Sequence, residues 1–168
     1  GECAESATRL FEALDISPAV HTIKVICTSG NINLDRLSYE SAIPEPTYEK
    51  VSPLSEQIIY EGQWNTEENE AFHFGKARTT DDSGASAEMT FDGTAIRWVG
   101  RRVINKYAVA LVYLDGEYVD TVYNYGEDET GKILFERTGL SEGKHVLRIT
   151  QSMHMIDIEY IAVGNIAN

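Results

Sequence analysis

Cysteine, basic side chains and long apolar runs are all scarce in this 168-residue sequence. Its two cysteines, Cys3 and Cys27, form no CxxC pairs, so a structural zinc site is unsupported. They are either a disulfide or two separate thiols, and the sequence leaves both open. No apolar run approaches the roughly 18 residues of a membrane span, and no basic segment followed by an apolar one predicts a signal peptide.

Basic residues number 14 against 27 acidic residues, which gives a formal net charge of −13. Nucleic-acid binding needs clustered lysine and arginine to neutralise phosphates, so nucleic acid is not an expected partner. An anionic membrane surface is excluded on the same ground. Hydrophobic residues make up 42% of the chain, which is enough for a folded core in one domain plus a fragment.

Familiar catalytic motifs are also missing. The sequence contains no GxSxG, HExxH, P-loop or GxGxxG pattern. Acidic groups occur at Asp81–Asp82 and at 127–129, and we interpret them as solvated surface in a chain this acidic. We therefore expect no catalysis by this chain and no cofactor. A structural calcium ion in the acidic loops stays an open alternative, because carboxylate oxygens are its usual ligands.

An internal repeat is the clearest feature that the sequence does contain. Residues 10–37 align without a gap to residues 134–161. The identical pairs are Leu10/Leu134, Phe11/Phe135, Glu12/Glu136, Ser17/Ser141, His21/His145 and Ile32/Ile156. The equivalent positions of His21 and His145 favour a structural role for these histidines. Asp157 and Glu159 share a strand face, and the polarity recurs at Asn33 and Asp35, which favours a salt bridge or a metal.

The repeat divides the chain into three parts. Residues 1–41 are predicted to be the C-terminal half of a preceding similar module, and residues 58–168 a complete module. Residues 42–57 hold three of the four prolines and are predicted to be a semi-rigid linker. The apolar strands within 9–37 should not stay exposed, so we expect them to pack on the complete module or on a second chain.

Alternating patterns in the complete module predict an all-β, antiparallel sandwich or barrel. The predicted strands are Gln57–Trp64, Ala85–Phe91, Thr94–Gly100, Tyr107–Leu114, Glu117–Tyr123, Ile133–Arg137, His145–Gln151 and Ile156–Val163. Asp92-Gly93 and Asp115-Gly116 predict tight hairpins, in which glycine takes a positive φ.

Antiparallel strands reverse direction, so alternate connections should meet at the same end. The connections 92–93, 115–116 and 138–144 are short and rich in glycine. The connections 65–84, 101–106, 124–132 and 152–155 are longer and chemically varied. We expect the second group to form a rim that carries the binding residues.

Aromatic rings beside polar side chains at that rim suit a sugar, whose C–H face stacks on rings while its hydroxyls need fixed donors and acceptors. The candidate binding residues are His73, Phe74, Arg101, Arg102, Asn105, Lys106, Tyr107, Tyr123, Asn124, Tyr125 and His154. Each has a plainer alternative, as a ring that shields a sheet edge or as a solvated charge. Trp64 and Trp98 are predicted to be core.

Several segments resemble the galactose-binding-like jelly rolls, a family of carbohydrate-binding modules appended to secreted bacterial glycoside hydrolases and esterases. The resemblance rests on Gly62 and Trp64, on Gly93-Thr94-x-Ile96, on the hairpin VYLDG at 112–116, and on GLxxGxH at 139–145. These are scaffold motifs, so they bear on fold more than on ligand. The resemblance implies a jelly roll with an N-terminal half-repeat of similar strands.

The same resemblance implies a secreted, multimodular parent protein and a carbohydrate partner bound at the rim. The predicted function is thus a non-catalytic module that targets a glycan-active protein to its glycan. Two alternatives stay open. One is a structural or protein-interaction β-sandwich that spaces other modules, and the other is an accessory domain of an esterase or glycosidase.

Overall fold

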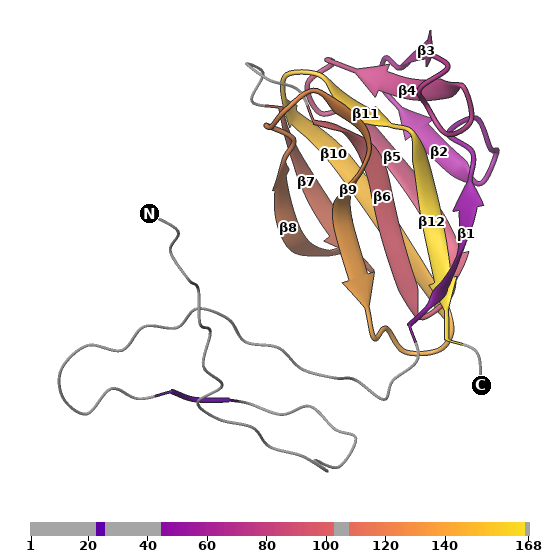
Figure 1. The fold of residues 1–168 in the computed structure, drawn as a ribbon, viewed down its shortest axis with the longest axis vertical. Coiled ribbons are helices and arrows are strands. Elements are labelled where there is room, and N and C mark those ends of the chain that lie inside the picture. The colour runs from indigo at the N-terminus through magenta and orange to yellow at the C-terminus, as the bar shows by residue number, and fades with distance from the viewer. Residues whose placement is uncertain (1–22, 26–44, 103–107, 167–168) are drawn as a thin grey trace, which may run out of the picture. The chain divides into compact units, whose positions relative to one another are not determined.

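The computed structural model describes residues 23–25, 45–102 and 108–166 of the chain. The chain divides into two compact units, residues 1–44 and residues 45–168 (Figure 1). Of the first unit only residues 23–25 are described, and they are exposed. The half-repeat at 1–41, its proposed self-association through 9–37, and the two cysteines lie outside the described residues.

The described part of the second unit consists of twelve β-strands in three antiparallel sheets and contains no helix. The four-stranded sheet has the order β1 (Thr47–Val51), β12 (Tyr160–Asn165), β6 (Ala95–Arg102) and β9 (Glu129–Thr138). The five-stranded sheet has the order β2 (Ile58–Glu61), β5 (Ser86–Asp92), β10 (Lys144–Met153), β7 (Val109–Leu114) and β8 (Glu117–Tyr123). The three-stranded sheet has the order β11 (Ile156–Ile158), β4 (Lys76–Thr80) and β3 (Asn65–Glu68). The predicted all-β sandwich is confirmed.

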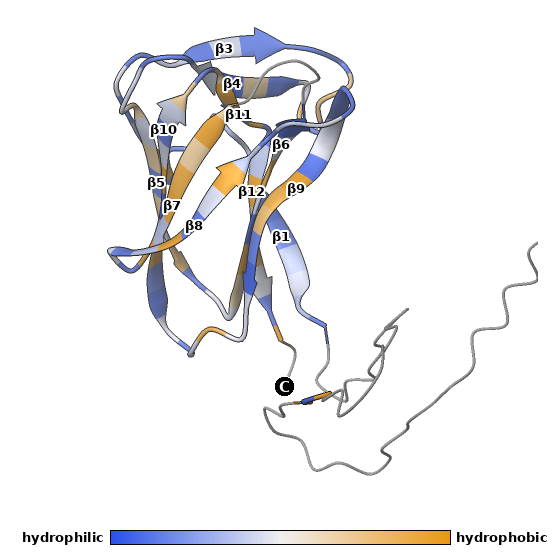
Figure 2. Cartoon of the chain, turned by 90° about the vertical axis from the view of Figure 1, so that its left-hand side faces the viewer, coloured by the Kyte–Doolittle hydropathy of each residue, from blue (hydrophilic) through white to orange (hydrophobic). Residues whose placement is uncertain are grey.

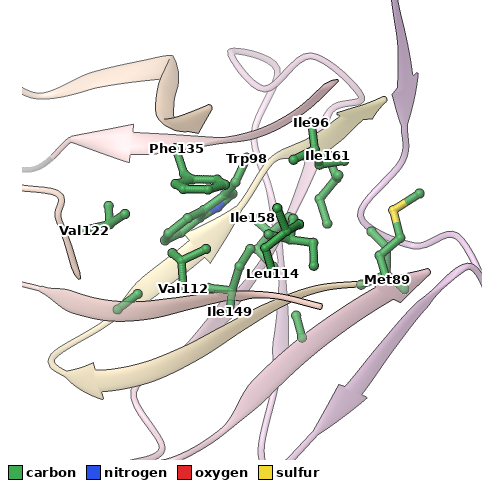
Figure 3. Packing of buried hydrophobic residues seen from close by; sticks show 14 of the residues in the cluster. Met89, Ile96, Trp98, Val112, Leu114, Val122, Phe135, Ile149, Ile158 and Ile161 are labelled. Carbon is green, nitrogen blue, oxygen red and sulfur yellow. The ribbon is translucent and has the colours of Figure 1, made fainter. Parts of the chain in front are cut away.

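The core lies between the four-stranded and the five-stranded sheets. Its side chains come from alternate positions of facing strands, as period-two strands require. Trp98 of β6 is fully buried and pairs in register with Phe135 of β9, and both contribute to the same buried cluster as Val112 and Ile149 (Figure 3). The indole Nε1 of Trp98 donates a 2.9 Å hydrogen bond to the Asp157 carbonyl oxygen. Trp98 is therefore core, as predicted, and Trp64 is half-buried at its margin.

Several strands follow the predicted segments closely. The prediction for Glu117–Tyr123 coincides with β8. The predicted strand Ile156–Val163 is divided into β11 and β12, which join different sheets on either side of Glu159.

Two predicted connections contain strands instead. Residues 47–51, inside the segment predicted to be a linker, form β1 and pair antiparallel with β12. Pro46 and Pro53 lie outside this strand, where proline removes no ladder hydrogen bond. The predicted connection 65–84 contains β3 and β4. With β11 they form the three-stranded sheet, which lies across the top of the sandwich in Figure 2, with β3 in hydrophilic blue.

Glycine is required at the two predicted hairpins for different physical reasons. At the β7–β8 turn, Asp115 and Gly116 both adopt positive φ, 54° and 83°, as the prediction required. Gly93 does not adopt a positive φ, so that part of the prediction is wrong. Instead, a Cβ at Gly93 would lie 2.7 Å from Cγ1 of Val163 and 2.9 Å from the Gly164 carbonyl oxygen. Close approach of β12 is what requires glycine there.

His145 closes this end of the sandwich and has the structural role that the repeat predicted. Its Nδ1 lies 2.7 Å from Asp115 Oδ2, and its Nε2 lies 2.9 Å from the Ser141 carbonyl oxygen. Both partners are acceptors, so the site favours the doubly protonated ring. The hydrogen bond to Ser141 and the Asp115 carboxylate raise the pKa of His145, and the His145 hydrogen bond lowers the pKa of Asp115.

We expect the free energy of unfolding of the module to fall as the pH rises through the pKa of His145. A raised folded-state pKa contributes stability that is fully present below the unfolded value of about 6.5 and is lost as the pH rises through the folded value. Because water screens half-exposed Asp115, the loss should be roughly 1 kcal/mol. Urea denaturation of the wild type and of His145→Gln at pH 5.5 and 8.5 measures it. The gap between the two proteins should shrink at the higher pH, and an unchanged gap would contradict the assignment.

Candidate functional site

The varied connections do meet at one end of the sandwich, opposite His145. There the Gly84 N–H donates to the Gln151 carbonyl at 3.1 Å, and the Asn124 N–H donates to the Ala108 carbonyl at 3.2 Å. Thr130 Oγ1 lies 3.4 Å from the Ala71 carbonyl oxygen. We use the term rim for this end, made of the connections 81–85, 124–128 and 154–155 and the loop 69–75 between β3 and β4. Of the predicted connection 101–106, Arg101 and Arg102 belong to β6, and residues 103–106 lie outside the described residues.

Arg101, near the end of β6 beside the rim, makes several hydrogen bonds. Its Nη1 and Nη2 each lie 2.8 Å from an oxygen of the Glu67 carboxylate, and its Nε lies 3.1 Å from Asp157 Oδ2. Its backbone N–H also donates to Asp157 Oδ1 at 3.0 Å. The side chain is 17% exposed and lies over the ring of Phe72, 5.1 Å from its centroid. Arg101 thus ties β3 and β11 to β6, and three of its five N–H donors are already used.

Two carboxylates are buried behind Arg101. Asp157 is 2% exposed and Glu159 is fully buried. Burial raises the pKa of Asp157 to about 6, although the hydrogen bond from the Arg101 backbone N–H and the charge of its guanidinium lower this pKa. Glu159 Oε1 accepts the Gly131 N–H at 2.6 Å, whereas its Oε2 is buried with no hydrogen-bond partner. The repeat predicted a salt bridge or a metal for these positions, and Asp157 forms the salt bridge.

A cavity of about 630 Å³ opens at the rim beside Arg101. It is lined by Ala71, Arg101, Arg102, Asp128, Glu129, Thr130 and Lys132. Arg102 is exposed, and Lys132 Nζ lies 2.7 Å from Glu129 Oε2. The lining thus offers cationic donors, carboxylate acceptors and a hydroxyl in one hollow, but no aromatic ring.

The predicted binding residues fall into separate places. Arg101 and Arg102 line the cavity. Tyr123 and Tyr125 are 65% and 45% exposed at the β8–β9 connection, whereas Asn124 between them is 2% exposed, with its Oδ1 unpartnered. His154 is exposed at a φ of 55°, and its carbonyl accepts a 2.6 Å hydrogen bond from Gln151 Nε2.

His73 and Phe74 lie apart from the cavity lining. Their rings meet at 4.7 Å between centroids, and the His73 ring lies 5.3 Å from that of Tyr160 in β12. Lys50 of β1 adds its ammonium 5.0 Å above the Tyr160 ring. Asn105, Lys106 and Tyr107 lie outside the described residues, and their role stays a prediction.

Sequence reasoning missed Lys132 and interpreted Asp128 and Glu129 as solvated surface. Arg102 pairs in register with Glu129, so the strands β6 and β9 bring these groups together. This register could not be predicted from local patterns, because it pairs residues nearly thirty positions apart.

Among residues 23–25, 45–102 and 108–166, no three His, Cys, Asp or Glu side chains gather in a metal-binding group. Over the same ranges, no helix has the length and apolar character needed to cross a bilayer. No protein-family model matches the chain.

Two curated enzymes contain a segment similar to this chain. The first is an A type blood alpha-D-galactosamine galactosaminidase of Flavonifractor plautii, 48% identical over 159 residues, which are 95% of this chain and 15% of that enzyme. The second is an A type blood N-acetyl-alpha-D-galactosamine deacetylase of the same organism, 36% identical over 144 residues, which are 83% of this chain and 18% of that enzyme. This chain is homologous to a short segment of each. It spans less than a fifth of either enzyme.

Known structures support the fold. A family two carbohydrate esterase from Cellvibrio japonicus superposes with a TM-score of 0.55 at 14% identity, over 71% of this chain and 34% of that chain. A two-domain esterase active on acetylated mannans, co-crystallised with mannopentaose, gives a TM-score of 0.56 at 14% identity, over 72% and 37% of the two chains. At this level of identity the likeness concerns the fold alone. The chain is thus a β-sandwich homologous to a small part of large glycan-active enzymes.

Proposed function

We propose that the chain is a non-catalytic accessory module of a larger, secreted glycan-active enzyme, and that it binds a glycan at the rim. The observation that carries the proposal is that homologous segments occur in two enzymes named for different reactions. A glycosidase and a deacetylase break different bonds, so the shared segment supplies something other than bond-breaking chemistry. Both names share A type blood galactosamine sugars, and a module that holds an enzyme on such glycans accounts for the sharing.

The rim cavity supports sugar binding by its size and lining. Its volume of about 630 Å³ falls within the range of roughly 300–1,000 Å³ that is typical of small-ligand sites. Arg102 and Lys132 can donate to sugar hydroxyls, while Asp128 and Glu129 can accept from them. Charged hydrogen bonds are the stronger ones, so four such groups around one hollow provide orientation as well as affinity.

The buried carboxylates argue against hydrolysis at this site. Glycoside hydrolysis needs two carboxyl groups on either side of the scissile bond. Asp157 is 2% exposed and held by Arg101, and Glu159 is fully buried. A glycosidic oxygen could not come within hydrogen-bond reach of either, so Asp157 and Glu159 cannot act as a catalytic pair on a sugar bound in the rim cavity.

Calorimetry with the full chain tests the proposal. The glycans should include one that ends in N-acetyl-alpha-D-galactosamine, its deacetylated form, and neutral mannose and glucose oligosaccharides as comparisons. We expect binding to a galactosamine-type glycan, weakened roughly ten- to a hundredfold in Arg102→Ala, since one charge-assisted hydrogen bond contributes about 1.5–3 kcal/mol.

Arg137→Ala is the matched control, because Arg137 is an exposed arginine near the opposite end of β9. Its affinity should equal that of the wild type. If no glycan in the panel binds, the proposed function is wrong and the β-sandwich spacer remains. If Arg102→Ala binds as the wild type does, the site lies elsewhere than the rim.

A further inference from the structure

A second and larger hollow, of about 820 Å³, lies on the outer face of the five-stranded sheet. Its floor consists of alternate residues of the central strand β10: Lys144, Val146, Arg148 and Thr150. Glu88 of β5 lines one side, Tyr113 of β7 lines the other, and the Asp115–Gly116 turn closes one end. We use the term sheet groove for this hollow.

Ion pairs hold the charged groups of the sheet groove in place. Arg148 Nη2 lies 3.3 Å from Glu61 Oε2, and its Nη1 lies 3.5 Å from Glu88 Oε2. The guanidinium is therefore positioned between two carboxylates while 41% of the side chain stays exposed. At the closed end, both oxygens of Asp115 are fixed, one by His145 and one by the Val146 N–H at 2.8 Å.

An aromatic wall borders the groove along β7 and β8. The rings of Tyr113 and Tyr118 meet edge to face, 5.9 Å apart at 72°, and Tyr118 is 56% exposed. The Tyr118 hydroxyl is fixed by Thr121 Oγ1 at 2.6 Å. Tyr113 lies on β7, which is orange along most of its length in Figure 2. A sugar ring could stack on this wall while its hydroxyls reach the charged floor.

We propose that the sheet groove binds a stretch of glycan chain, at a site separate from the rim. This inference rests on the proposed glycan-binding function. Four of the eight lining residues are charged, namely Glu88, Asp115, Lys144 and Arg148. The centres of protein–protein interfaces are depleted of charged residues, whereas hydroxyl-rich ligands need fixed donors and acceptors beside a ring. The lining therefore favours a saccharide over a protein segment.

The shape of the groove selects an oligosaccharide. From Lys144 to Thr150 the floor extends for six residues of a β-strand, roughly 20 Å. That length exceeds a single sugar ring. The rim cavity is smaller, about 630 Å³ against about 820 Å³, which suits one terminal sugar. The two sites therefore differ in what they recognise: the rim takes the end of a glycan, and the sheet groove takes its internal units.

A length series tests this assignment with the full chain. Calorimetry compares a monosaccharide, a disaccharide and a tetrasaccharide that share one terminal sugar of the galactosamine type. We expect the tetrasaccharide to bind about tenfold more tightly than the monosaccharide, because each fixed polar contact adds affinity. Arg148→Ala should remove most of this gain and leave the monosaccharide affinity unchanged. Arg137→Ala should behave as the wild type.

Tyr113→Ala is an independent variant of the groove. We expect Arg148→Ala to fold, since surface ion pairs contribute only about 0–1 kcal/mol. Urea denaturation checks the folding of both variants. An affinity that does not depend on length, or a gain that survives in Arg148→Ala and Tyr113→Ala, would overturn the groove while rim binding still stands. If no member of the series binds, the proposed function itself fails, and the groove assignment fails with it.

Discussion

Replacing Arg101 with alanine is expected to lower the free energy of unfolding by about 3–5 kcal/mol. The guanidinium is the partner of Asp157, whose side chain is 3% exposed, and it also binds Glu67 through two hydrogen bonds. Removing it leaves a buried carboxylate without its counter-charge and releases β3 from β6. Urea denaturation at pH 8, followed by circular dichroism, measures the loss.

The same variant should be less destabilised at pH 5 than at pH 8. Burial already raises the pKa of Asp157 to about 6, and loss of Arg101 raises it further, so at pH 5 the carboxyl is neutral and burial costs less. Arg102→Ala is the control, since exposed Arg102 should change stability by about 0.5 kcal/mol or less. A stable R101A protein that loses glycan binding would instead make Arg101 a ligand contact, as the sequence suggested.

Replacing Trp98 with alanine should cost about 3–5 kcal/mol, which is a large part of the stability of a small domain. The side chain is fully buried between the two large sheets (Figure 3). The substitution opens a cavity beside Phe135 and leaves the Asp157 carbonyl oxygen without its indole donor. Thermal or urea denaturation should show the change, or the protein should fail to fold.

Trp64→Ala is the comparison that separates burial from residue type. Trp64 is half-buried, contacts the Tyr60 ring at 4.8 Å, and donates to the Glu61 carbonyl oxygen at 3.1 Å. Its loss should cost about 1–2 kcal/mol, because a half-buried side chain removes less apolar surface from water than a fully buried one. Equal losses for the two tryptophans would contradict the assignment of Trp98 to the centre of the core.

Strands with alternating side chains could be located from the sequence, and those without could not. In β10 the side chains alternate between buried and half-buried from His145 to Gln151, which is the range that was predicted as a strand. Asn65–Glu68 is wholly polar, with no apolar side that would indicate a strand, yet it pairs with β4 as β3. Thr47–Val51 was hidden by the prolines on both sides of it, and it forms a strand because β12 offers an unpaired edge.

The candidate site shows the same division. The gathering of varied connections at one end could be predicted, because antiparallel strands alternate their direction. Asn124 was a candidate for binding from its residue type and its loop, but it is 2% exposed, and no local pattern reveals that burial. The sheet groove escaped prediction because its lining joins residues of β5, β7 and β10, which only the register of the sheet brings together.

The sequence by itself determined that the chain folds into an antiparallel sandwich and which end carries its varied loops. Both depend on local periodicity and on strand reversal, which neighbouring residues encode. Only the tertiary structure decided which polar side chains remain available to a ligand. Arg101, Glu67 and Asp157 are far apart in the chain, and their pairing depends on how the three-stranded sheet packs against β6. Adjacent Arg102 has the same chemistry but stays exposed, because successive side chains of a strand point to opposite faces.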